Sequence, residues 1–280
     1  MRFTRFLRTQ APVRQANRAH ALRFPYNQRY LLAFWRTLYC TPGEYRLQPQ
    51  QSVAWNRGAY LVQGLGHCSA CHAARDVLGG SLGAQRLAGG TLGDNGWDAS
   101  PLGGKRDALE LAELLHSSVS ERSAVYGPMA EVVAGSLQHM TSGDVHGISE
   151  YLGGIAREQL PARAPDSAAV AAAQPLLRQG GKIYAAQCAS CHGEQGEGVA
   201  RAYPRLAGKP SMSTNNTIRM VQSGGYAPST VGNPRPYGMP PFGGVLSDVE
   251  VAAVVSYVNR SWGNQGALAL PHEVERLRGR

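Results

Sequence analysis

The sequence has no apolar run long enough to cross a membrane. A membrane-spanning helix needs about 20 consecutive apolar residues, and the longest apolar stretch near the start, Tyr30 to Trp35, is far shorter. Residues 1–20 are basic and lack the apolar centre of a secretory signal peptide. From these absences, we expect neither a membrane span nor a visible export signal.

Charged residues are also scarce, at 17% of the 280 residues, and acidic residues are almost missing from the first fifty. Residues 1–50 hold nine Arg and one acid, Glu44, for a net charge of +8 out of +9 in the whole chain. Because nearly all of the net positive charge lies in this arm, nucleic-acid binding by the rest of the chain is not expected. Two interpretations of the arm stay open: docking to an acidic partner or anionic lipid, or an Arg-rich solvated surface.

Cysteine is rare, and four of the five cysteines fall in two copies of one pattern. The copies are Cys68-Ser69-Ala70-Cys71-His72 and Cys188-Ala189-Ser190-Cys191-His192. C-x-x-C-H is the attachment signature of c-type haem. The two thiols add to the two vinyl groups of one porphyrin, and the histidine reaches the iron as proximal ligand. The sequence therefore predicts two covalently bound haem c groups.

Other uses of these cysteines lack supporting residues. A thioredoxin-like site would need a βαβ pattern, and a zinc site would need further ligands at fixed spacing. Disulfides within each C-x-x-C are possible in an oxidising compartment, but such loops are strained and usually redox-active. The fifth cysteine, Cys40, has apolar neighbours, and we expect a buried thiol there.

The chain repeats one plan twice: a helix, C-x-x-C-H, a loop, a methionine in a Gly/Pro setting and a final helix. Helices are expected over 29–39, 57–65, 105–118, 176–186, 216–223 and from Asp248 to about Ser261, with a capping box at Ser247 to Glu250. We expect an all-α chain divided as follows: basic helical arm 1–50, packed on the first haem domain 51–160; linker 161–173; second haem domain 174–266; tail 267–280.

A second axial ligand should close each iron, and methionine sulfur would raise its potential. In the second domain we expect Met239, in Gly-Met-Pro-Pro. In the first we favour Met129, after Gly127-Pro128, over Met140, which has no neighbouring proline. Bis-histidine ligation is the other possibility, through a residue among His67, His116, His139 and His146.

This plan resembles the class I cytochrome c fold. In that fold a glycine eight residues before the first Cys and an aromatic four before it mark the crossing of the first and last helices. Gly180 and Tyr184 match, whereas Tyr60 and Gly64 stand in reverse order. The resemblance also implies that Pro204, and more weakly Pro101, offers a carbonyl to the proximal histidine. Candidate partners of the haem propionates are Arg75, Trp97, Arg205 and Arg235.

A closer resemblance is to the cytochrome c subunits of membrane-bound alcohol, aldehyde and gluconate dehydrogenases, over roughly residues 20–266. It is carried by five stretches: Trp55 to Val62, Gly66-His67-Cys68, Gly127 to Val133, Leu246-Ser247-Asp248 and Ser261 to Asn264. Such subunits usually have three haem domains and an export signal. On this resemblance the first haem domain is missing. A truncated gene product, a wrongly chosen start at Met1 and a true two-haem variant are the open interpretations.

The resemblance implies a periplasmic electron carrier associated with the inner membrane through its partner. Electrons would pass from the large dehydrogenase subunit through the haems to quinone or a downstream cytochrome or oxidase, without catalysis by this chain. The competing functions are a dihaem enzyme of the thiosulfate dehydrogenase or peroxidase type and a non-functional fragment. The substrate of the partner dehydrogenase does not follow from the sequence.

Overall fold

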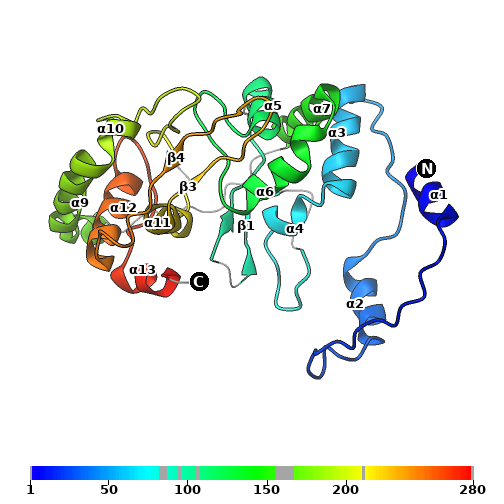
Figure 1. Cartoon of the computed structure of the whole chain (residues 1–280). Helices are drawn as coiled ribbons and strands as arrows, with labels where there is room; N and C mark the ends of the chain where they lie inside the picture. The colour runs from blue at the N-terminus through cyan, green and yellow to red at the C-terminus, as the bar shows by residue number, and fades with distance from the viewer. Residues whose placement is uncertain are drawn as a thin grey trace. The chain divides into compact units, whose positions relative to one another are not determined.

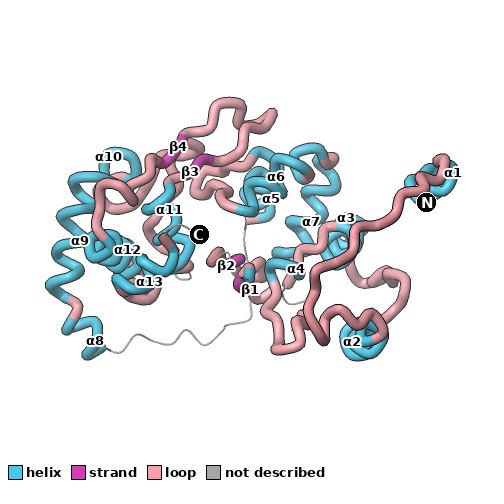
Figure 2. Tube along the Cα trace, turned by 60° about the horizontal axis from the view of Figure 1, so that its bottom comes forward, coloured by secondary structure: helices cyan, strands magenta, loops and turns pink. Residues whose placement is uncertain are grey.

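The computed structural model describes residues 2–81, 87–93, 96–104, 107–155, 167–209 and 212–278. The chain divides into two compact units, Met1–Glu44 and Tyr45–Arg280. Helices and loops make up nearly all of the described chain, and Figure 2 shows the strands as two short pairs. The expectation of an all-α fold is therefore confirmed. No described helix has the length and apolar character needed to cross a bilayer.

The first unit contains two helices, α1 (Arg2–Thr9) and α2 (Leu31–Tyr39). The expected helix over 29–39 is present and begins two residues later. None of its residues is buried, and Phe34 is 66% exposed. Cys40, directly after α2, is exposed, so the prediction of a buried thiol is wrong. The apolar neighbours of Cys40 lie on this exposed helix and do not bury it.

The second unit begins with a group of helices that surrounds the first C-x-x-C-H motif, and we call it the first helical group. Its elements are α3 (Val53–Tyr60), π-helix η1 (Leu61–Leu65), α4 (Ser69–His72), β1 (Gly90–Thr91), β2 (Asp98–Ala99), α5 (Ala108–Ser117), α6 (Pro128–Gly135), 3-10 helix η3 (Leu137–His139) and α7 (Ser142–Gly154). Asp107 caps α5, which covers most of the expected helix 105–118. The first two residues of that expected helix, Lys105 and Arg106, lie outside the described chain.

Helices α3 and α7 cross at two glycines, Gly58 and Gly147. A Cβ on Gly58 would overlap the carbonyl oxygen of Gly147, so only glycine allows this approach. The crossing glycine therefore lies ten residues before Cys68, and neither Tyr60 nor Gly64 occupies it. The π-helix η1 and the turn before Cys68, where His67 has φ of 49°, take up the two additional residues. π-helical segments of this kind are frequent at functional sites.

The remaining elements form a second helical group, which surrounds the second motif. They are α8 (Ser167–Ala172), α9 (Gln174–Gln187), α10 (Ala189–His192), α11 (Thr214–Ser223), β3 (Gly225–Tyr226), β4 (Gly238–Met239), α12 (Asp248–Arg260) and α13 (Pro271–Leu277). Helices α9 and α12 lie side by side (Figure 1). At their contact, a Cβ on Gly180 would overlap the carbonyl of Ala253. The crossing expected from Gly180 is therefore present. The capping box at Ser247 and Glu250 is confirmed.

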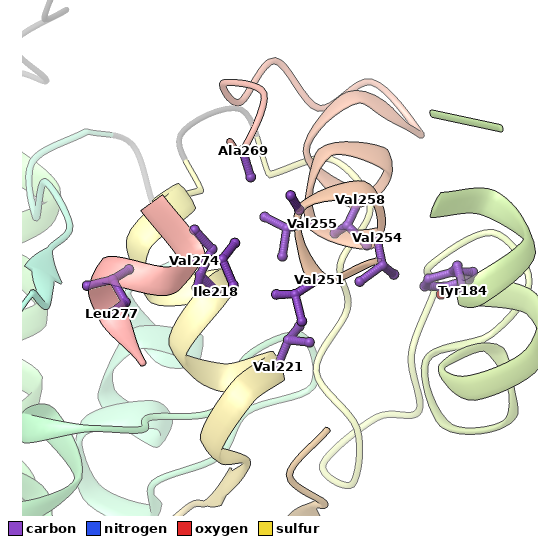
Figure 3. Close-up of a cluster of buried hydrophobic side chains, with 11 residues drawn as sticks. Tyr184, Ile218, Val221, Val251, Val254, Val255, Val258, Ala269, Val274 and Leu277 are labelled. Atoms are coloured by element: carbon purple, nitrogen blue, oxygen red, sulfur yellow. The ribbon is translucent and has the colours of Figure 1, made fainter. Parts of the chain in front are cut away.

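Each group has its own buried cluster. Around the second motif, valines of α12 point between α11 and α9, with Ile218 on one side and Tyr184 on the other (Figure 3). The rings of Tyr184, Tyr257 and Trp262 pack together at 4.9 to 5.6 Å between centres. Burying aromatic side chains contributes much of the stability of a small domain. In the first group, Trp55 and Tyr151 make the corresponding pair at 5.0 Å.

The segments expected to be a linker and a tail contain helices. Of the expected linker 161–173, residues 161–166 lie outside the described chain, and α8 occupies most of the remainder. In the expected tail, α13 buries Val274 and Leu277 in the cluster of the second group. Residues 271–277 are thus part of that core, because α13 supplies an apolar face that α11 and α12 cover.

Candidate haem-attachment sites

The second C-x-x-C-H motif forms one helical turn at the end of α9. The N–H of Cys188 donates to Tyr184 O at 2.9 Å, and the N–H of His192 donates to Cys188 O at 2.9 Å. Residues three apart on a helix lie on the same face, so Cys188 and Cys191 present their thiols to one side. Both thiols are free. This is the arrangement that two thiols need to reach one porphyrin.

The ring of His192 is oriented by a backbone carbonyl. Its Nδ1 lies 3.0 Å from Pro204 O, and because a carbonyl only accepts, Nδ1 carries the proton. The other nitrogen, Nε2, then keeps a lone pair for a metal ion. Burial lowers the pKa of His192, which favours the neutral ligand form. The position expected for Pro204 is therefore observed.

The first motif has the same geometry with a different acceptor. The N–H of His72 donates to Cys68 O at 2.9 Å, and Nδ1 of His72 lies 2.7 Å from Ser100 O. The observed acceptor therefore belongs to the residue before Pro101. A proline at this place restricts the backbone of the residue that precedes it, so Pro101 can hold the Ser100 carbonyl in position.

Arginine also contacts the first motif. Arg75 donates to Ala70 O, inside the C-x-x-C-H turn, and to Gly79 O in the following loop, both at 2.9 Å. Two bonds from one guanidinium connect the turn to the loop and restrict their relative motion. Arg75 was expected as a propionate partner; the observed bonds give it a supporting contact to the attachment turn.

The first thiol of each motif is partly buried and prefers its neutral form. Burial raises the pKa of Cys68, and it raises the pKa of Cys188 to about 11. Neutral thiols are weak nucleophiles toward disulfides. Among the described residues there is no group of three or more His, Cys, Asp or Glu that could hold a metal ion by itself.

Met239 lies on a backbone that is held by a strand pair. β3 and β4 pair antiparallel, with Gly225 opposite Met239. At Gly224, φ is 65° and a Cβ would overlap the carbonyl oxygen of Met239, so the turn after α11 requires glycine. The Met239 side chain is partly buried against the cluster of the second group. Met212 packs against the same cluster but lies before α11 in the chain.

Two methionines pack against the cluster of the first group. Met129 is the second residue of α6, after Gly127 with φ of 56° and Pro128. Met140 directly precedes Thr141, which caps α7. Both side chains are partly buried on the same cluster. Met129 and Met140 both follow α5 and the bridge at Val119 and Ala124, so the order of elements does not distinguish them.

Comparisons with known proteins find similarity to cytochromes. Residues 175–258 match the family described as cytochrome C oxidase, cbb3-type, subunit III. The gluconate 2-dehydrogenase cytochrome c subunit of Pantoea cypripedii is 33% identical over 92% of this chain and 64% of that protein. The cytochrome c subunit of the alcohol dehydrogenase (quinone) of Gluconobacter oxydans is 34% identical over 92% of this chain and 58% of that protein.

Over most of its length the chain is similar to c-type cytochromes. It is a homologue of dehydrogenase cytochrome c subunits. One subunit of the nicotinate dehydrogenase of Pseudomonas putida is also similar, with 38% identity over 90% of this chain and 22% of that protein. The chain thus spans about three fifths of the gluconate and alcohol dehydrogenase subunits and about a fifth of the nicotinate dehydrogenase subunit. The expected family resemblance is confirmed, and with it covalently bound haem c.

The residues at both motifs are suited to hold covalently bound haem c. Each turn offers two free thiols three residues apart and an imidazole whose Nδ1 is bonded to a carbonyl, which leaves Nε2 for iron. The four other histidines considered as ligands are less suited. His67, His139 and His146 are exposed, His146 lies 4.0 Å from Glu150, and His116 is half-buried on α5.

Proposed function

We propose that this protein is a dihaem electron-transfer cytochrome with one six-coordinate haem c at each motif. The haems would be attached by Cys68 and Cys71 at the first motif and by Cys188 and Cys191 at the second. The proximal ligands would be His72 and His192. The distal ligands would be Met129 and Met239. The observation that carries the proposal is the repeated bond from a motif histidine to a backbone carbonyl. A bond of this kind supports a ligand nitrogen at each turn.

The bound haem supplies the redox chemistry, since its iron takes up and releases one electron. The residues of the chain would attach the haem, orient its ligands and tune its potential. The bond from His192 to Pro204 fixes the ring and raises its basicity. A thioether at Met239 favours ferrous iron and so raises the potential. Cys68 and Cys188 pack partly buried against the two clusters, and apolar surroundings of this kind also affect the potential.

We infer that the electrons come from the large subunit of a dehydrogenase and leave to quinone or to a downstream cytochrome or oxidase. The support is that similar proteins are named as cytochrome subunits of gluconate and quinone-dependent alcohol dehydrogenases. Since haem is normally attached outside the cytoplasm, this exchange would take place in the periplasm, next to the inner membrane. The basic arm would meet an acidic partner or anionic lipid by charge complementarity, and nucleic acid is not proposed as a partner.

An enzyme of the thiosulfate dehydrogenase or peroxidase type would need an exchangeable position at one iron. Met239 is held on paired strands and packed on a core, which supports a closed position instead. Met129 and Met239 would occupy the remaining position at each iron, so no substrate would bind the metal. Multiple turnover of thiosulfate or peroxide by the isolated protein would contradict the relay proposal.

The dihaem proposal is tested by expressing the chain in a bacterial periplasm that has haem-ligation machinery. Mass spectrometry of the matured protein should give two haem additions. The double variant Cys188→Ala, Cys191→Ala should give one, because the first motif belongs to a separate cluster. Fewer than two haems on fully matured wild-type protein would refute the proposal.

A further inference from the structure

Residues 96–100 contact the supports of both candidate axial ligands in the first helical group. The carbonyl oxygen of Ser100 accepts the ring Nδ1–H of His72 at 2.7 Å. Trp97, three residues earlier, lies against Gly127, where a Cβ would come within 3.0 Å of the indole ring. Gly127 stands two residues before the proposed distal methionine. Trp97 and Ser100, three residues apart, therefore contact the supports of the two candidate axial ligands of the first site, Trp97 at Gly127 and Ser100 at His72.

The same segment is tied to α11 of the second helical group. The N–H of Asp98 donates to Asn216 Oδ1 at 2.8 Å, and Asn216 Nδ2 donates to Asp98 O at 2.8 Å. Ser213 Oγ donates to the Asp98 carboxylate at 2.6 Å. The guanidinium carbon of Arg219 lies 5.6 Å from the centre of the Trp97 ring. Together these contacts join Trp97 and strand β2 to helix α11.

This contact is buried and closely packed. Asn216 is 6% exposed and Arg219 is 7% exposed. Gly96 has φ of 65°, and a Cβ there would lie 2.6 Å from Leu277 and 2.8 Å from the Arg219 guanidinium. A buried amide that pairs with both the N–H and the carbonyl of one residue allows one register only. The two groups are therefore held in a specific alignment at this place.

Helix α11 also reaches the proposed ligand of the second site. Its C-terminal cap is Gly224, which packs directly on the carbonyl of Met239. At 1.5 Å per residue, about 12 Å of helix separates Asn216 from this cap. One helix, α11, therefore connects the contact at Asp98 with the backbone of Met239.

We propose that Trp97 and Asp98, held by Asn216 and Arg219, form the junction that couples the two haem sites for electron transfer within the chain. This inference rests on the proposed dihaem function and adds the positioning residues between the sites. In the coupled step one electron leaves ferrous iron at one site, which becomes ferric, and reduces ferric iron at the other. No bond and no proton is exchanged. Electron tunnelling slows steeply with the distance between the two haem sites. The junction would hold that distance constant and so set the rate of transfer between them.

The test uses the matured wild-type holoprotein and the variants Trp97→Leu and Asn216→Ala. A laser-triggered reductant delivers one electron to the oxidised protein, and the redistribution of that electron between the haems is followed by absorbance. Each variant should slow redistribution at least tenfold while retaining two haems. Hydrogen exchange supplies a readout that does not depend on the haems: in Asn216→Ala the amide of Asp98 should exchange faster.

Thr230→Val is the matched control. It removes the 2.8 Å bond from Thr230 Oγ1 to Ser117 O, which joins the same two helical groups at another place. Its redistribution rate should stay within twofold of the wild type. If this control slows transfer as much as the junction variants, or if both junction variants transfer at the wild-type rate, the coupling inference fails and the dihaem function stands. Wild-type protein with fewer than two haems would overturn both.

Discussion

At the scale of single residues, the chemistry of each site depends on which sulfur reaches iron. Met239→Ala should remove the sulfur-to-iron absorption band of one haem and lower its potential, because a soft ligand favours ferrous iron. Potentiometric titration with optical detection measures both. Met212→Ala, on the same cluster, should change neither. At the first site Met129→Ala should act like Met239→Ala, and Met140→Ala should not; the reverse result would transfer the ligand role to Met140.

At the scale of elements, α3 crosses α7 at Gly58 and α9 crosses α12 at Gly180. Gly58→Ala would force the α3 backbone away from Gly147, and overpacking of this kind costs about 1–3 kcal/mol or more. Urea denaturation of the holoprotein measures this loss. The control is Gly153→Ala on α7, where a Cβ meets nothing within 4 Å and helix propensity should add up to about 1 kcal/mol. Equal stability of Gly58→Ala and wild type would show that the crossing tolerates a side chain.

At the scale of the whole molecule, the net positive charge is concentrated in the part of the sequence that precedes both C-x-x-C-H motifs. Residues 1–50 carry +8 of the net +9, and Arg14, Arg18 and Arg23 are exposed. If this arm docks the partner dehydrogenase, changing these three to Gln should slow haem reduction by that dehydrogenase severalfold at low salt. Since charges are screened over about 10 Å at 0.1 M salt, the difference should shrink as salt rises. Stopped-flow absorbance measures the rate.

The control for the arm changes exposed arginines elsewhere in the chain. Arg178→Gln and Arg276→Gln alter the net charge but leave the arm intact. Their reduction rate should remain close to that of the wild type. Equal slowing by the two sets of variants would mean that net charge, and not the arm, steers the encounter.

Much of the fold could be predicted because its signals are local. Helical periodicity and caps located most helices to within a few residues, and the capping box at Ser247 and Glu250 is present as expected. Other local expectations were wrong. Cys40 is exposed because the helix before it buries none of its residues. The first crossing uses Gly58 because a π-helix adds residues before Cys68, and no pattern of apolar residues announces such a segment.

The sequence by itself predicted haem attachment at the two motifs, since two thiols and an imidazole at fixed spacing have few other uses. Only the tertiary structure decided what surrounds them. It selected Ser100 as the carbonyl partner of His72 and brought Asp98 to Asn216, 118 residues further along the chain. The reason is physical: attachment needs residues that are neighbours in the chain, whereas orientation and coupling need neighbours in space, which depend on how the two helical groups pack.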